Sequence, residues 1–263
     1  MIKRILAGSI LALGLIGCGG SGNNSGTCYV YGINAISNLG SLSITANGTT
    51  VVSGAAYQAS SSAFVSTNAG TDALLYLTNS SNSQLASGST TFTSGDYYTA
   101  YAIGNAINQY LFVYETNVTP PTTANTGRLI FVDASIAQPS VDIYITLSGG
   151  VQGSAAIRSL TPFTTGLAAE VDNLPTGTYD VQFKVAGTTT VLVDEPSVTI
   201  GTTAATNEVQ IVGISDTVPT TGATTQAALP VISVPVIAGS TFPRVKNSHP
   251  IVIGHPGMTE FPK

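Results

Sequence analysis

The chain has little charge and few of the side chains that most enzymes use for catalysis. Charged residues make up 8% of the 263 residues, there are two cysteines, and both histidines, His249 and His255, lie near the C-terminal end. No basic residue occurs between Arg4 and Arg128. Because phosphate neutralisation requires clustered Lys and Arg, this composition argues against nucleic acid as a partner.

The scarcity of histidine also restricts the classes of catalysis. A Ser-His-Asp or Cys-His arrangement would require the C-terminal segment to fold back over the rest of the chain. A zinc site from His249 and His255 would lack an acidic partner nearer than Glu260. Asp194 and Glu195 are adjacent, but neighbours on a strand point to opposite faces and do not readily flank one glycosidic bond. The sequence therefore predicts no catalytic, metal or cofactor site.

The N-terminal residues have the pattern of an export signal. Lys3 and Arg4 precede an apolar run over residues 5–16, which is shorter than the roughly 20 residues of a membrane-spanning helix. Leu15-Ile16-Gly17-Cys18 resembles a bacterial lipobox, in which the chain is cut before a cysteine that carries diacylglycerol. We therefore expect residues 1–17 to be a lipoprotein signal peptide and Cys18 to be lipidated. The alternatives are an ordinary signal peptide with a chance cysteine, or a buried helix.

Lipidation would fix the location of the protein. Several acyl chains, at about 0.8 kcal/mol per buried methylene, would hold the N-terminus in a membrane permanently. In a Gram-negative host, Gly19 rather than Asp after the cysteine resembles the signal for the outer membrane. We therefore expect a lipid-anchored protein of the bacterial cell envelope, facing the periplasm or the cell surface. Cys28 would then be the remaining thiol. We expect it to be a small buried apolar residue, with intermolecular pairing as the alternative.

Short apolar segments bounded by Gly, Asn and Ser are typical of β-strands. They are rich in β-branched and aromatic residues and include 29–33, 42–45, 74–77 and 97–103. After the second of them, Asn47-Gly48 predicts a tight hairpin, because both residues tolerate positive φ. No segment after residue 17 sustains helical periodicity with caps at both ends. The sequence therefore predicts an all-β mature protein.

The chain also resembles itself at a distance of about a hundred residues. An offset of 99 places 34–44 over 133–143, one of 107 places Leu74 over Val181, and one of 109 places 101–104 over 210–213. The offset grows along the chain, as small insertions in loops of a second copy would produce. This pattern predicts two tandem copies of one unit.

Three segments of the second copy carry a resemblance to a known family. They are "LIFVDASIAQPSVDIYI" (129–145), "LPTGTYDVQFKVAGTTTVLV" (174–193) and "VTIGTTAATNEVQIVG" (198–213). Together they resemble the bacterial domain-of-unknown-function family 4397, with Asp133 where that family often has His. In the first copy, "TFTSGDYYTAYAIG" (91–104) is similar to the last strand of the family. The resemblance implies a small β-sandwich in exported, often lipid-anchored proteins, and it supplies no catalytic residues.

These observations predict two tandem immunoglobulin/transthyretin-like antiparallel β-sandwiches after the signal peptide. The expected boundaries are a lipidated tether at 18–27, a first sandwich at 28–115, a linker at 116–127, a second sandwich at 128–214 and a proline-rich tail at 215–263. The tail contains apolar segments interrupted by prolines, so it would dock as an edge strand or stay loose.

Two classes of function follow from this architecture. The favoured one is a non-catalytic envelope protein that attaches to the membrane through its lipid and binds an envelope protein or a polysaccharide. The alternative is an envelope hydrolase acting on carbohydrate through the carboxylates of Asp133, Asp142, Asp194 and Glu195. An exposed row of tyrosines would favour sugar binding. Tyr97, Tyr98 and Tyr101 form one candidate row, although the common face of Tyr97, Tyr101 and Ile103 is more typical of core packing.

A calcium site is a weaker interpretation of the same carboxylates. Asp133, Asp142 and a turn carbonyl would supply the hard oxygen ligands. The first copy has Ser43 where the second has Asp142, and no dense loop of aspartates occurs. We therefore expect Asp142 and its neighbours to serve as strand scaffold, with Val141 and Ile143 facing a core and Asp142 and Tyr144 facing outward.

Overall fold

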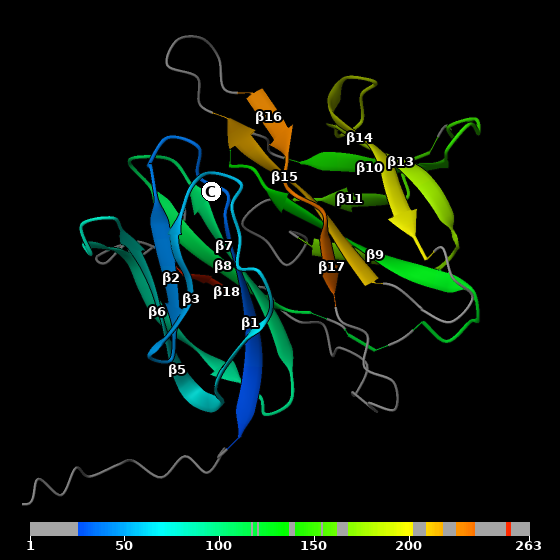
Figure 1. The fold of residues 1–263 in the computed structure, drawn as a ribbon. Helices are drawn as coiled ribbons and strands as arrows, with labels where there is room; N and C mark the ends of the chain where they lie inside the picture. Colours follow the sequence, from blue (N-terminus) through cyan, green and yellow to red (C-terminus); the bar gives the residue numbers. More distant parts are fainter. Residues whose placement is uncertain are drawn as a thin grey trace, which may run out of the picture.

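The computed structural model describes residues 26–116, 118–119, 121–136, 140–153, 155–161, 168–201, 209–217, 225–234 and 251–253. Within these residues the chain forms β-strands and no helix, which confirms the predicted all-β class. No helix in this part of the chain is long and apolar enough to cross a membrane. Figure 1 shows the strands gathered into four sheets.

Residues 27–115 form the N-terminal sheet pair. One sheet has the order β8-β7-β1-β4 and the other β3-β2-β5-β6. The strands are β1 (Thr27–Asn34), β2 (Leu42–Ala46), β3 (Thr49–Ala55), β4 (Val65–Asn68), β5 (Gly70–Asn79), β6 (Gln84–Phe92), β7 (Tyr97–Gly104) and β8 (Gln109–Glu115). The predicted hairpin between β2 and β3 is confirmed, because Asn47 and Gly48 have φ of 46° and 80°.

Strands between residues 126 and 234 form the C-terminal sheet pair. One sheet has the order β12-β9-β15-β16, with β17 also pairing with β15, and the other has the order β11-β10-β13-β14. The strands are β9 (Thr126–Ala134), β10 (Val141–Leu147), β11 (Arg158–Leu160), β12 (Ala168–Pro175), β13 (Gly177–Val185), β14 (Val191–Ile200), β15 (Val209–Thr217), β16 (Thr225–Ala228) and β17 (Ile232–Val234).

The strand order of the N-terminal pair recurs in the C-terminal pair. Counting strands from the start of each pair, both have the fourth, first, seventh and eighth strands in one sheet and the third, second, fifth and sixth in the other. In each pair the first strand lies parallel to the seventh, β1 to β7 and β9 to β15. All other strand pairs of the described residues are antiparallel, so each sheet pair is a mainly antiparallel sandwich with one parallel contact.

The register shows where the offsets read from the sequence were wrong. Ile44 and Ile143 are equivalent at the offset of 99, and they pair with Leu77 and Phe183 respectively. Leu77 therefore corresponds to Phe183, and Leu75, not Leu74, corresponds to Val181. Leu75 is fully buried, whereas Leu74 is 47% exposed. A slip of one residue moves every side chain of a strand to the opposite face, and this accounts for the difference.

Both central sheets have two buried faces. Along β1, Val30 points into the core of the N-terminal pair, whereas Tyr31 and Ile33 belong to a second apolar cluster. That cluster contains Tyr101 and Phe112 from the N-terminal sheet as well as Ile130, Val132, Val209 and Ile211 from the C-terminal sheet. The four sheets therefore stack as four layers, in which the β8-β7-β1-β4 sheet packs against the β12-β9-β15-β16 sheet (Figure 1).

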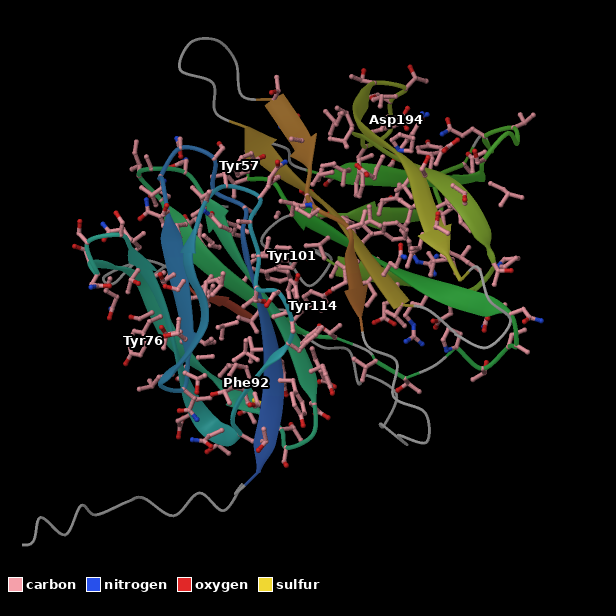
Figure 2. All side chains as sticks on the ribbon, in the orientation of Figure 1. Tyr57, Tyr76, Phe92, Tyr101, Tyr114 and Asp194 are labelled. Carbon is pink, nitrogen blue, oxygen red and sulfur yellow. The ribbon has the colours of Figure 1, made fainter. Side chains whose placement is uncertain are left out.

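Polar contacts at the end of this junction also join the two sheet pairs. The Tyr57 hydroxyl lies 2.8 Å from the Ser215 Oγ, and Gln58 Nε2 donates to the carbonyl oxygen of Ala228 at 2.6 Å. Figure 2 shows Tyr57 beside the β15 and β16 strands, and Tyr101 and Tyr114 in the middle of the molecule. The junction between the two pairs is thus an extended, mainly apolar interface with polar contacts at its margin.

Segments of the chain after Ile214 still form strands of the sheets. β15 continues to Thr217, and β16 and β17 both pair with it. A further strand, β18 (Ile251–Ile253), pairs with β8 in the N-terminal sheet. The boundary that we expected at 214 is therefore too early, because turn-forming residues that resembled a linker connect strands of one sheet.

Candidate functional site

Asp133 and Asp216 lie at the ends of two neighbouring strands, β9 and β15. The Ser135 hydroxyl donates to Asp216 Oδ1 at 2.5 Å, and the Ile136 N–H donates to Asp216 Oδ2 at 2.6 Å. The Ser135 N–H donates to Asp133 Oδ1 at 2.9 Å. These hydrogen bonds hold the turn that follows β9, so both carboxyl groups support the local backbone.

The Asp133 side chain lies in a buried environment that disfavours its ionised form. It has no exposed surface, and its Oδ2 atom has no hydrogen-bond partner. Burial raises the pKa of Asp133 well above its usual range, and the nearby charge of Asp216 raises it further. The carboxyl group is therefore stabilised in its protonated form.

Asn34 occupies the position in β1 that corresponds to Asp133 in β9. Its Oδ1 accepts the N–H of Ile36 at 2.9 Å, which matches the contact between Asp133 and Ser135. Its Nδ2 donates to the carbonyl oxygen of Ala55 at 2.9 Å. In β1 both polar atoms of the Asn34 amide therefore have hydrogen-bond partners, whereas in β9 only one oxygen of Asp133 has one. The shared contact with the turn after the strand supports a structural role for Asp133.

We expect Asp133→Asn to stabilise the protein at pH 7 by about 1–3 kcal/mol, because it removes the cost of keeping a buried carboxyl group protonated at a pH where the unfolded chain ionises it. A raised pKa means that the folded protein keeps a proton that the unfolded chain has lost. Wild-type stability should therefore fall as pH rises above about 4, the ordinary aspartate value, while the variant lacks this dependence. Urea unfolding at pH 4 and pH 7 measures the difference.

Asp72→Asn is the matched control for this measurement. Asp72 is an exposed residue of β5, and we expect its replacement to change stability by less than about 0.5 kcal/mol. If the Asp133→Asn variant unfolds more easily than the wild type at pH 7, the structural role assigned to the protonated Asp133 side chain is wrong.

Asp142 lies on the outer face of a different sheet. Its Oδ1 accepts the Ser159 hydroxyl at 2.5 Å, and its Oδ2 accepts the Gly187 N–H at 2.8 Å. Asp142 therefore connects β11 with the turn between β13 and β14. The structure does not bring Asp142 together with Asp133, and no group of three or more metal-binding side chains of the His, Cys, Asp or Glu type occurs in the described part of the chain.

Asp194 and Glu195 follow one another on β14 and face different neighbours. Asp194 lies opposite Gln182, and Glu195 lies opposite the buried Val181. Burial raises the pKa of Glu195, and the adjacent Asp194 charge raises it further. Figure 2 shows Asp194 on the outer side of the molecule. The two carboxylates thus occupy successive positions of β14, opposite different residues of β13.

A polar network on the outer face of β10 and β13 was not predicted. The Lys184 Nζ lies 4.2 Å from the centroid of the Tyr144 ring and donates to Gln152 Oε1 at 2.7 Å. Gln152 Nε2 donates in turn to Gln182 Oε1 at 2.7 Å. Alternation in the two strands places Tyr144, Gln182 and Lys184 on one face, but the contribution of Gln152 from a connecting loop has no sequence signal.

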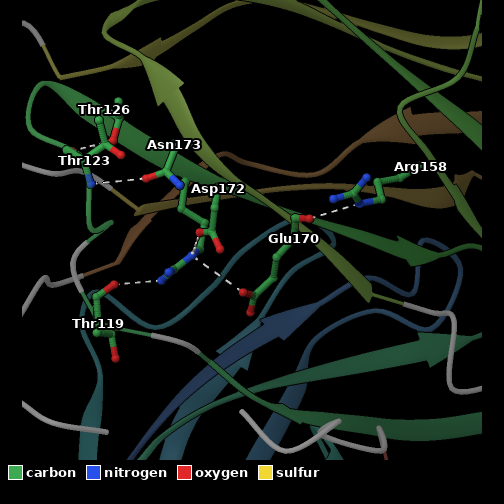
Figure 3. Close-up of polar contacts among 8 residues, drawn as sticks. Thr119, Thr123, Thr126, Arg158, Glu170, Asp172 and Asn173 are labelled. Carbon is green, nitrogen blue, oxygen red and sulfur yellow. Dashed lines mark hydrogen bonds and ion pairs between the residues drawn. The ribbon is translucent and has the colours of Figure 1, made fainter. Parts of the chain in front are cut away.

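Arg128 forms a second unpredicted cluster, shown in Figure 3. Its side chain is buried, its Nε donates to Asp172 Oδ1 and lies 3.6 Å from Glu170 Oε2, and its Nη1 donates to the Thr119 carbonyl oxygen at 2.8 Å. Beside it, the Thr123 N–H donates to Asn173 Oδ1 at 3.3 Å. The cluster ties β12 to β9 and to the chain segment that joins the two sheet pairs.

The remaining residues singled out from the sequence have structural positions or lie outside the described residues. Cys28 is fully buried, which confirms its predicted environment, and burial raises the pKa of its thiol to about 11. Tyr97 and Tyr101 are buried at the junction between the sheet pairs, so they confirm core packing and cannot form a sugar-binding platform. Cys18, His249, His255 and Glu260 lie outside the described residues.

The exposed large apolar side chains of the described residues are all aliphatic. They are Leu74, Ile107, Leu147, Val151, Ile157, Val191 and Val231. The outer face of the β3-β2-β5-β6 sheet also carries a row of uncharged polar groups, because Thr45 pairs with Tyr76, and Tyr76 pairs with Ser87. Figure 2 shows Tyr76 on this outer side. The described outward faces thus carry aliphatic and uncharged polar groups.

Comparison with known families gives one match. The family model described as "Domain of unknown function (DUF4397)" matches residues 28–144, from β1 into β10. No curated protein matches the chain. The match extends over the whole N-terminal sheet pair and the first strands of the C-terminal pair, and its description assigns no chemistry.

Proposed function

We propose that the protein is a non-catalytic, lipid-anchored component of the bacterial cell envelope that binds an envelope protein or a polysaccharide. The main observation in support is the separate structural use of its carboxylates. Asp133 is buried, Asp142 fixes a turn, and Asp216 accepts two hydrogen bonds from the turn after β9. Most glycoside hydrolases use two carboxyl groups that flank one glycosidic bond, whereas these groups lie in different environments.

We further propose that the chain contains two tandem DUF4397-like β-sandwiches. The recurrence of one strand order in residues 27–115 and 126–228 supports this, as do the equivalent roles of Asn34 and Asp133. In this proposal, lipidated Cys18 attaches the protein to the outer membrane, and the polar residues before β1 serve as a tether.

The test is capture of a partner from solubilised envelope. The full-length protein, recovered with its anchor, is cross-linked in intact cells, and the captured material is assayed separately for protein and for glycan. A partner above background is expected. Leu74→Lys and Val191→Lys each place a charge on a different exposed face and report which sheet makes the contact, because both positions are substantially exposed.

A second arm of the experiment separates binding from hydrolysis. Asp142→Asn, Asp194→Asn and Glu195→Gln should leave capture unchanged, and the wild type should show no turnover on a panel of envelope glycans. Capture of neither protein nor glycan contradicts the proposal, and so does turnover that these substitutions abolish. Protease treatment of intact cells then determines whether the domains face the surface or the periplasm.

A further inference from the structure

The outer edge of β8 is occupied by a strand from far along the chain. In β18, Ile251 lies opposite Val113, Val252 opposite Phe112, and Ile253 opposite Leu111, in an antiparallel ladder. Every other described strand of the N-terminal sheet pair comes from residues 27–115. Figure 1 shows β18 beside β8, and it also lies against β6 in the facing sheet. β18 thus covers the side of the N-terminal pair where both sheets end.

Apart from β18, β8 is the edge strand of its sheet, and its side chains pack into the core of the N-terminal pair and into the junction. Leu111 and Phe112 have no exposed surface, and Val113 is 3% exposed. β8 pairs with β7 on one side, so without β18 its other side would present unpaired N–H and C=O groups next to apolar side chains. An uncovered edge of this type is a template for any extended apolar segment.

The shortness of β18 favours its detachment from β8 and its replacement by another segment. It contains three residues, so few ladder hydrogen bonds hold it, and short segments of this kind open at low cost. In the sequence, Pro250 directly precedes the segment and Pro256 comes three positions after Ile253, and proline has no N–H to donate to a ladder. Sixteen residues separate Val234 at the end of β17 from Ile251, and at about 3.3–3.6 Å per residue such a length of chain reaches roughly 55 Å when extended.

We propose that the β8 edge is a strand-acceptor site and that its second occupant is the Ile251–Ile253 segment of another copy of this chain. The contacts at the edge are the same whether the segment arrives from the same chain or from a neighbour, so exchange conserves the ladder and links copies together. Copies anchored in one membrane, as proposed above, would meet at high effective concentration. This effective concentration depends on the proposed anchor, whereas the acceptor site itself does not.

The experiment uses the full mature chain made soluble by Cys18→Ser, carrying one of two affinity tags. Both tagged forms are expressed together, one tag is captured, and co-purification of the other is quantified. We expect the two forms to co-purify. Because N–H groups alternate between the two sides of a strand, the double variant Ile251→Pro/Val252→Pro removes at least one ladder donor, and it should reduce co-purification by about tenfold or more.

Ile251→Val/Val252→Ile is the matched control, since it keeps both backbone donors and the apolar character of the segment. It should co-purify like the wild type. Thermal unfolding of each variant separates loss of exchange from loss of the fold, and hydrogen exchange at Leu111, Phe112 and Val113 reports whether the edge is covered. If the two tagged forms of the wild type do not co-purify, the proposal is wrong. It is also wrong if the Ile251→Pro/Val252→Pro variant is folded and still co-purifies like the wild type. Neither result bears on capture of an envelope partner.

Discussion

Replacing Cys18 by Ser is expected to move the protein from the membrane fraction to the soluble fraction of a bacterium that lipidates exported proteins. Serine lacks the sulfur that forms the thioether to diacylglycerol, so the variant would lose every acyl chain of the anchor. At about 0.8 kcal/mol per buried methylene, this loss removes essentially all membrane affinity. Fractionation together with metabolic labelling by an alkyne analogue of palmitate measures the effect.

Cys28→Ala provides the matched control for this experiment. Cys28 is fully buried in the N-terminal pair and lies outside the lipobox sequence. The control should stay in the membrane fraction and keep its label, with a stability cost of about 1 kcal/mol from the lost side-chain contacts. A Cys18→Ser protein that still carries label and sediments with membranes would show that Cys18 is not the anchor.

Replacing Arg128 by Ala should destabilise the protein by about 2–4 kcal/mol. The guanidinium is buried and holds Asp172, Glu170 and the Thr119 carbonyl at once. The expected loss is smaller than for a fully buried ion pair, because the Asp172 side chain is 48% exposed and water solvates it once the guanidinium is removed. Urea unfolding at constant pH measures the change.

Arg158→Ala is the control for the loss of an arginine from the same region. Arg158 is exposed and donates to the backbone oxygen of Glu170 at 3.1 Å, so its removal should cost less than about 1 kcal/mol. Arg128→Lys should fall between the two, since an ammonium group cannot reproduce the fork of a guanidinium. Equal stability of the Arg128→Ala and Arg158→Ala variants would contradict the role given to the cluster.

The sequence predicted the strands well where local chemistry decides the outcome. Residues 29–33 and 97–103 form β1 and β7, and Asn47-Gly48 forms the hairpin, because β propensity and positive φ are properties of the residues themselves. The parallel pairing of β1 with β7 could not be predicted. It joins segments separated by about 70 residues, and alternating apolar residues do not encode the direction of a neighbouring strand.

The alternation of apolar residues also does not distinguish a core inside one sheet pair from an interface between two sheet pairs. Tyr31, Tyr101 and Phe112 have the spacing of a buried strand face, but the sequence does not state what covers them. The Arg128 cluster was missed for a related reason. Its partners Glu170 and Asp172 are more than 40 residues away, and charge pairing at that separation depends on the completed fold.

The position of β1 has a mechanical consequence. It begins at Thr27, just after the polar segment that leads from Cys18, and it lies between β7 and β4 in its sheet. Tension applied through the N-terminus would act along β1 and load the ladder from Tyr29 to Asn34 in shear, so that the bonds to β7 resist together and not one after another. A protein held in this way would tolerate drag on its outer end without its first strand peeling from the sheet.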